Sequence, residues 1–482
     1  MDKERRLIQI RGSGLNHFVL YSALLRLIDP VRGDPTRLLD ENPDSSLLSA
    51  SQLKKKFLDS FALICATSDK GAETAAAVCL ETNQQTGNIL RVARNHGFCP
   101  NVLASLENVL QLLRDVARKG TCFLNSLLNF TDIATATEKI SAHAETEMLQ
   151  LVVKLDRDRI LSIAEKIEKR GIRDSLEKAS SRLHSGRAKA EKLSGWVANH
   201  PFTAPPQNWS DATTAMFIDW AAQARWHHAA QLQPLLSNDD TGNQFWLKHL
   251  HKVARYHSAI KSMVKLAVKE PEIFAQISIK GSRAPKQLHF RYPYDENPLL
   301  TVRNIVGANS RPVMEQLENR LDTSNLEARL RRACRLDLTL HAEMQLVVFY
   351  EGNPAHNPCM RFIGTSKKAC FLCDKYMRLH PLRLQTSASH QKIYPSWMPP
   401  PYYGTTETSI RTPFMKLSKE IEELATRELK HGLTVPRRVW NHDSTAGPSL
   451  TATATVPTEL RSVGAGRRKV TAVDSSSSED SE

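Results

Sequence analysis

Two short motifs bring potential metal ligands into one stretch of the chain. The first is HAE at residues 341–343, and the second is CFLC at residues 370–373. One imidazole and two thiolates are good zinc ligands, and a catalytic zinc site keeps a fourth position open for water. The carboxylate of Glu343 is suited to general acid/base chemistry. These residue types therefore indicate zinc-assisted hydrolysis.

The elements around the motifs are expected to bring these groups together. Residues 342–350 are apolar and predict a helix, which places His341 and Glu343 at or near its start. A short buried strand is expected at residues 360–364, and a second helix is expected to open at Cys370. Cys370 and Cys373 then share one helix face, and a helix N-terminus lowers the pKa of a thiol. The sequence therefore predicts a metal held by His341, Cys370 and Cys373, with Glu343 reaching the nearby water.

The same residues resemble the cytidine-deaminase-like superfamily, and more closely a set of largely fungal deaminases related to a bacterial OTT-type group. The matching blocks are HAEMQL at 341–346, FIGTSKKACFLC at 362–373 and SHQKIYPSWMPP at 389–400. The resemblance implies an α/β fold, a three-layer α/β/α sandwich with a mixed sheet. It differs from many superfamily members at Ala369, where they carry proline directly before the first cysteine.

The resemblance also implies an activity and its site residues. His341, Cys370 and Cys373 would hold Zn²⁺, and Glu343 would take a proton from water and pass it to the base ring and the departing ammonia. The expected reaction is hydrolytic deamination of a nucleobase, with cytosine preferred over adenine. The expected substrate is a nucleotide or a nucleic acid.

Two alternatives remain open. A closed structural zinc site would add a fourth ligand, for which the candidates are Cys334, Cys359, His356 and His380. Such a site would leave Glu343 without a role. The second alternative is an inactive deaminase fold that serves as an interaction or nucleic-acid-binding module. The intact Glu343 argues against it, because a binding module needs no proton shuttle.

Three regions are expected along the chain. Residues 1–270 predict a mostly helical N-terminal region of unknown role, because apolar residues recur at three- and four-residue spacings. Residues 271–435 predict the deaminase-like zinc domain, and residues 436–482 a disordered Ser/Thr-rich tail with an acidic end. Within the second region, alternation predicts a strand at 288–292, and helices are expected at 314–338 and 412–430, the last with Pro413 in its first turn.

Aromatic and histidine clusters of the helical region favour a structural role. Trp196, Trp209, Trp220 and Trp226 fall close together and are expected to pack a helical core. The neighbouring pair at 227–228 is not expected to bind a metal, because consecutive residues of a helix point in different directions.

Composition limits the class of protein and its partners. The 482 residues carry a formal net charge of +14, which favours polyanionic partners such as nucleic acid or nucleotides. Eight cysteines in no disulfide pattern fit a reducing compartment. Neither a secretory signal nor a transmembrane run is visible. We therefore expect an intracellular protein, cytoplasmic or nuclear, with no membrane partner; oligomeric state leaves no signal in the sequence.

Overall fold

The computed structural model describes residues 7–37, 49–68, 70, 72–82, 87–126, 130–183, 188–236, 242–308, 310–356, 358, 360–403 and 407–435. Within these ranges no helix is both long enough and apolar enough to cross a membrane. The predicted tail at 436–482 lies outside the described residues.

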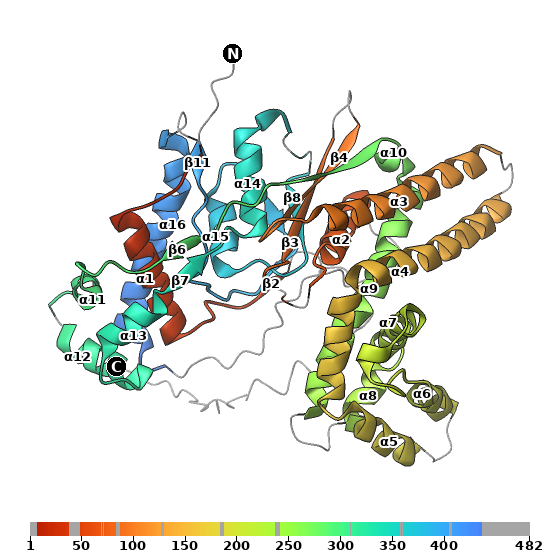
Figure 1. The fold of residues 1–482 in the computed structure, drawn as a ribbon, viewed down its shortest axis with the longest axis horizontal. Coiled ribbons are helices and arrows are strands. Elements are labelled where there is room, and N and C mark those ends of the chain that lie inside the picture. The colour runs from red at the N-terminus through yellow and green to blue at the C-terminus, as the bar shows by residue number, and fades with distance from the viewer. Residues whose placement is uncertain are drawn as a thin grey trace, which may run out of the picture.

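A mixed five-stranded sheet organises the part of the molecule that carries the two motifs (Figure 1). Its strand order is β5-β4-β3-β8-β9. The strands are β3 (Ala76–Glu81), β4 (Asn88–Arg94), β5 (Ile277–Gly281), β8 (Phe362–Thr365) and β9 (Gln385–Thr386). β3 runs antiparallel to both β4 and β8, whereas β4 with β5 and β8 with β9 are parallel pairs. The expectation of an α/β fold with a mixed sheet is thus confirmed.

Helices cover both faces of this sheet. α2 (Ala50–Ile64) and α3 (Pro100–Ser126) pack on one face, and α14 (Ala342–Gly352) and α15 (Phe371–Leu379) lie on the other. Successive side chains of a strand point to opposite faces. Accordingly Val78 of β3 joins the apolar cluster around α2, and Cys79 joins the cluster around α14. The sheet is therefore buried on both sides.

One close backbone approach fixes α2 on the sheet. A Cβ atom placed on Gly364 of β8 would lie 2.2 Å from the backbone carbon of Leu58 in α2. Any larger side chain at this position would push the helix away from β8. Thr365, the next residue, donates its backbone N–H to the buried carboxylate of Asp59 at 2.8 Å.

Two strands of the sheet, β3 and β4, precede residue 270, and the other three follow it. The predicted boundary between the helical region and the zinc domain therefore divides a single sheet. β3 and β4 fall inside the region expected to be mostly helical. Both strands are almost wholly buried, and no residue of β3 is exposed. Periodicity cannot separate such a run from a buried helix. The extra strands matter for the site, because β4 ends beside α14.

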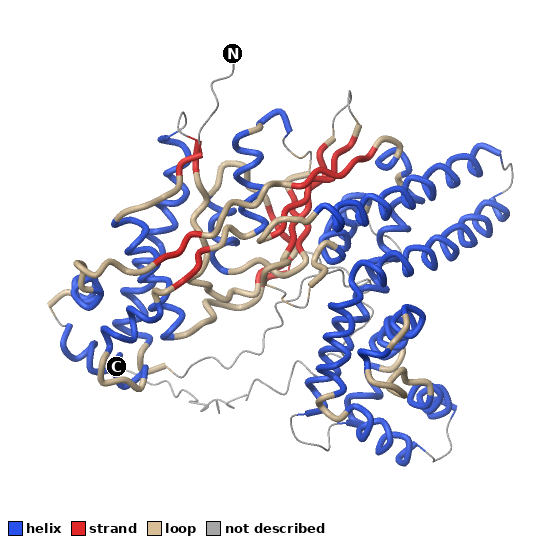
Figure 2. The backbone as a smooth tube through the Cα atoms, viewed as in Figure 1, coloured by secondary structure: helices blue, strands red, loops and turns tan. Residues whose placement is uncertain are grey.

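A bundle of helices stands next to the sheet (Figures 1 and 2). Its long members are α4 (Phe130–Glu168), α7 (Asp211–Trp226) and α9 (Gly242–Lys269), which pack on one another. Shorter elements complete it: α5 (Ile172–Leu183), α6 (Ala188–Ala198), η2 (Pro206–Asn208), α8 (Ala229–Leu236) and α10 (Pro271–Phe274). The rings of Trp196 and Trp220 stack 4.2 Å apart. Both are buried with Trp209, which confirms their core role.

The remaining elements surround α14 and α15. α1 (Ser13–Ile28) packs beside α16 (Glu407–Arg427), which η4 (Glu428–Gly432) continues. Three short antiparallel pairs complete this part of the fold: β1 (Leu7–Ile8) with β11 (Tyr402–Tyr403), β2 (Thr36–Arg37) with β10 (Ala388–Ser389), and β6 (Leu288–Phe290) with β7 (Leu336–Leu338). A short 3-10 turn, η3 (Pro354–His356), follows α14.

Two expectations for this region were partly wrong. The helix predicted at 314–338 is divided into α12 (Ser310–Leu321), α13 (Leu326–Ala333) and strand β7, with α11 (Pro298–Val306) before them. The break follows Asp322, whose positive φ of 49° cannot continue a helix. Pro413 lies inside α16 and not in its first turn. The strand predicted at 288–292 is confirmed as β6.

Candidate metal centre

The backbone places His341 at the start of α14. His341 is the N-cap residue, with extended dihedral angles of −63° and 150°, and its carbonyl oxygen accepts the first helical bond from Gln345 N–H at 3.0 Å. Glu343 lies in the first turn of the same helix. Both residues therefore lie at the start of α14, as the sequence predicted.

The end of β4 holds this helix start in place. The side-chain oxygen of Asn95 accepts a hydrogen bond from Ala342 N–H at 2.8 Å, and its amide donates to Ala72 O at 2.7 Å. The amide of Gln345 donates to the carbonyl oxygens of Leu340 at 3.0 Å and of Arg94 at 2.9 Å. Residues far apart in the sequence thus orient His341.

The two cysteines open α15. Cys370 is the N-cap residue, and its Sγ accepts a hydrogen bond from Cys373 N–H at 3.4 Å. The indole of Trp397 donates from Nε1 to Cys373 Sγ at 3.3 Å. Both thiols are buried. Hydrogen bonds of this kind orient sulfur ligands and tune their basicity.

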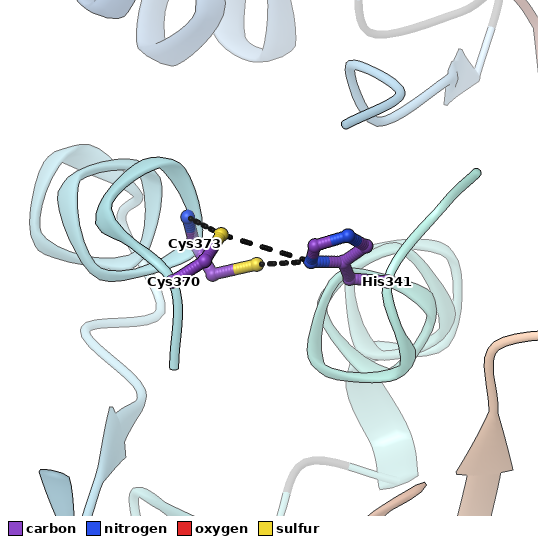
Figure 3. A group of neighbouring side chains, drawn as sticks. All are labelled: His341, Cys370 and Cys373. Carbon is purple, nitrogen blue, oxygen red and sulfur yellow. Dashed lines mark hydrogen bonds between the residues drawn. The ribbon is translucent and has the colours of Figure 1, made fainter. Parts of the chain in front are cut away.

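The three predicted ligands face one another between the two helices (Figure 3). Nδ1 of His341 lies 3.7 Å from Cys370 Sγ and 3.3 Å from Cys373 Sγ. The three candidate ligand atoms lie within 4.8 Å of one another. Among the described residues, they form a cluster of His and Cys side chains that could hold a metal ion. One nitrogen and two sulfur donors at such spacing fit the ligand chemistry of zinc.

The candidate fourth ligands of a closed site do not join this group in the described part of the chain. His356 pairs with Glu81 at 3.3 Å, and His380 pairs with Glu351 at 3.4 Å. Cys334 is buried at the C-terminal end of α13. Cys359 lies outside the described residues. Among the described residues the group therefore holds three candidate ligands, and the alternative with Cys359 as a fourth stays open.

Glu343 lines a cavity of about 300 Å³ together with two of the candidate metal ligands. His341, Glu343 and Cys370 line it, together with further residues from several elements: Asn95, His96, Lys367, Lys368, His390, Tyr394 and Ser396 among them. Glu343 is only 9% exposed. Burial raises its pKa, although the neighbouring His341 opposes the shift. A buried carboxyl with a raised pKa holds its proton more readily than an exposed one, which suits general acid/base chemistry.

The charges of the three ligands are coupled. Burial alone would lower the pKa of His341, but the adjacent Cys370 thiolate and Glu343 raise it. Burial would raise the pKa of Cys370, yet hydrogen bonds from Cys373 and the charge of His341 lower it well below its ordinary value. Burial and the Cys370 charge raise the pKa of Cys373. A bound dication would displace the protons held by the imidazole and the two thiols.

Sequence reasoning missed most of the residues that surround the ligands. Asn95 and His96 follow a strand that was read as helix, so no local signal marked them. Lys368 and Lys367 stand two and three residues before Cys370, outside the HAE and CFLC motifs. The proline-rich segment at 394–403 contributes Tyr394 and Ser396 to the cavity wall.

A comparison with known families agrees with this geometry. Residues 340–401 match the family model of an OTT_1508-like deaminase. The chain resembles the OTT-type deaminases. The matched segment contains both motifs, and together with the His/Cys/Cys group it supports a deaminase. No curated protein and no solved structure matches the chain. The expected likeness to a largely fungal subset stays a prediction.

Proposed function

We propose that this protein is a zinc-dependent hydrolytic deaminase that acts on a nucleobase, with cytosine preferred over adenine, in a nucleotide or nucleic acid. The observation that carries the proposal is the facing set of His341, Cys370 and Cys373 beside the buried carboxyl of Glu343. The mixed sheet with helices on both faces supports the three-layer sandwich of the cytidine-deaminase-like superfamily.

His341, Cys370 and Cys373 would hold the metal. When bound, zinc supplies Lewis-acid chemistry and lowers the pKa of water. The two thiolates would balance its charge, and the hydrogen bond from Trp397 would keep Cys373 oriented. The contact between Asn95 and Ala342 N–H would hold the start of α14 and with it the imidazole.

Glu343 would carry the protons of the reaction. Its carboxylate accepts a proton from the attacking water and delivers it to the base ring, and a second transfer accompanies the departing ammonia. A C–O bond forms at the amino-bearing ring carbon as the C–N bond breaks. The raised pKa of Glu343, caused by its burial, favours a group that alternates between its two protonation states.

Charge at the cavity supports an anionic substrate. Lys367 and Lys368 line the cavity at the turn before Cys370, and both are half-buried. Ammonium groups in this position suit the phosphate of a nucleotide or of a nucleic acid. The net charge of +14 over the whole chain agrees with the same class of substrate.

The experiment is an ammonia-release assay across cytosine and adenine nucleosides, their monophosphates, single-stranded DNA and RNA, with the zinc content of the same sample measured in parallel. We expect zinc near one equivalent and ammonia from a cytosine compound that carries phosphate. Polymer products are checked by sequencing for C-to-U and A-to-I changes. A zinc-loaded protein that releases no ammonia from any member of the panel contradicts the proposal.

A further inference from the structure

His390 is a cavity residue to which the mechanism above gives no role. It follows β10, and its side chain is only 3% exposed. It lines the same cavity as Glu343 and His341. A histidine so deeply buried at the wall of a polar cavity needs a hydrogen-bonding partner on each ring nitrogen.

Backbone hydrogen bonds hold His390 in register with the first cysteine of the candidate site. Ala369 N–H donates to Ala388 O at 2.9 Å, and His390 N–H donates to Ala369 O at 3.0 Å. Phe371 N–H then donates to Lys392 O at 3.0 Å. Cys370 lies between these contacts, so the position of His390 relative to it is fixed by a short parallel ladder.

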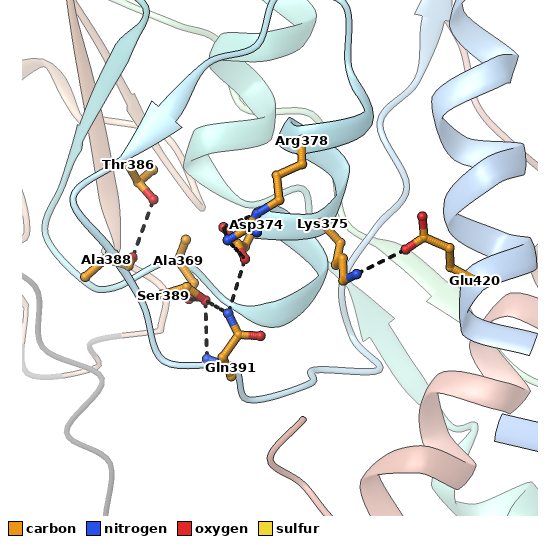
Figure 4. A network of polar contacts seen from close by, with 9 residues as sticks. All are labelled: Ala369, Asp374, Lys375, Arg378, Thr386, Ala388, Ser389, Gln391 and Glu420. Atoms are coloured by element: carbon orange, nitrogen blue, oxygen red, sulfur yellow. Dashed lines mark hydrogen bonds and ion pairs between the residues drawn. The ribbon is translucent and has the colours of Figure 1, made fainter. Parts of the chain in front are cut away.

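Side chains on either side of His390 brace the same loop (Figure 4). The amide of Gln391 donates to Asp374 Oδ2 at 3.2 Å and to Ser389 Oγ at 2.8 Å, and Ser389 Oγ donates to Ala369 O at 3.1 Å. Gln391 has a φ of 55°, in the left-handed region that a residue with a side chain rarely adopts. The brace offsets this cost and holds the turn that presents His390 to the cavity.

The ring of His390 has a defined tautomer. Lys392 N–H donates to Nδ1 at 3.0 Å, so Nδ1 is an acceptor and the ring proton is on Nε2. In the described part of the chain, Nε2 meets no further hydrogen-bonding residue. Burial, with the charges of Lys392 and Lys368, lowers the pKa of His390 to about 3, so the ring is neutral. Nε2–H is therefore a neutral donor on a ring whose residue lines the cavity.

We propose that His390 is a substrate-binding residue, whose Nε2–H donates a hydrogen bond to the ring carbonyl oxygen of a pyrimidine base. The inference rests on the deaminase function proposed above. Cytosine has such a carbonyl and adenine has none, so this contact favours cytosine. A donor here would also reject the exocyclic amino group, which must turn instead toward Glu343. The cavity of about 300 Å³ is large enough for a nucleobase.

The test measures equilibrium binding of uridine 5′-monophosphate, which retains the ring carbonyl and is not consumed. Two substitutions separate the ring nitrogens. H390Q places an amide donor near the Nε2 position, whereas H390N retains a group near Nδ1 for Lys392 N–H and removes the donor to the cavity. H289Q and H289N, at an exposed position of β6, are the matched controls. Zinc content and thermal unfolding are recorded for every variant.

We expect H390N to weaken uridine monophosphate binding by about 10- to 100-fold, the usual effect of removing one partner of a buried hydrogen bond. H390Q should recover most of that loss, and neither variant should lose zinc. Equal binding by wild type, H390N and H390Q overturns the assignment of His390 while ammonia release from wild type still supports the deaminase. If wild type neither binds the nucleotide nor releases ammonia from any cytosine or adenine compound, both proposals fail.

Discussion

Trp397 Nε1–H donates a hydrogen bond to Cys373 Sγ across 3.3 Å, in a region where both residues are fully buried. This contact joins the proline-rich segment to one of the candidate metal ligands. A partner that orients a ligand typically changes metal affinity 10- to 100-fold when it is removed. The segment after α15 therefore belongs to the site as much as the motifs do.

The first prediction concerns this contact. W397F should keep the fold and bind zinc about 10-fold more weakly, because the sulfur loses its donor while the aromatic packing is largely retained. Competition with a chelator measures the affinity. W226F in α7 is the matched control, since that residue lies in the helical bundle. Equal zinc affinity in W397F and wild type would remove the indole from the site.

The second prediction concerns the ligands themselves. C370S should lose zinc and unfold at a lower temperature than wild type, because metal binding is coupled to folding. Metal analysis by mass spectrometry and a thermal unfolding curve report the two effects. C334S alters a buried cysteine outside the ligand group and should retain the metal. Loss of zinc in C334S to the same degree would favour a four-ligand site.

The third prediction concerns the support given by β4. N95L removes the acceptor of Ala342 N–H and the donor to Ala72 O, and should lower both zinc affinity and stability, the latter by roughly 1–2 kcal/mol. N95D retains the acceptor and should fall between N95L and wild type. Chelator competition and chemical denaturation provide the two measurements. An N95L protein with wild-type affinity would show that α14 needs no such support.

The fourth prediction is a pH dependence of stability in the helical bundle. Asp156 of α4 is fully buried, its carboxylate oxygens accept no hydrogen bond from any described residue, and burial raises its pKa to about 8. The folded state therefore binds a proton that the unfolded state releases near pH 4. Stability contributed by this group is present below pH 4 and is lost as the pH rises toward 8.

D156N should remove the loss of stability that Asp156 causes between pH 4 and pH 8. Its free energy of unfolding relative to wild type should increase from pH 4 to pH 8, by more than about 1 kcal/mol in total. Denaturant titrations at several pH values measure the difference. D158N, at an exposed position of the same helix, should track wild type at every pH. A constant difference between D156N and wild type over this range would contradict the raised pKa of Asp156.

The sequence predicted the elements that carry local signals. The apolar helix after His341, the strand at β8 and the helix opening at Cys370 all have clear periodicity or end signals, and the three candidate ligands lie close together as expected. The sequence did not predict β3 and β4, because both faces of these strands are buried and no alternation of polar and apolar residues marks them. Asn95, which follows β4, was therefore not predicted as a residue of the site.

His390 and Trp397 illustrate a different limit. Both lie in a loop with no regular periodicity, and both bond to residues far back in the sequence: His390 N–H donates to Ala369 O, and Trp397 Nε1–H donates to Cys373 Sγ. The backbone ladder between residues 369–371 and 388–392 depends on tertiary packing. No propensity of the single residues predicts it.

The most direct test of the central claim is ammonia release by E343Q, measured with its zinc content on the substrate that wild type prefers. The account predicts a protein that retains zinc and the wild-type unfolding temperature, while the rate falls by about 10²- to 10⁴-fold, the usual contribution of a positioned acid/base. A zinc-loaded E343Q that releases ammonia at the wild-type rate would contradict it.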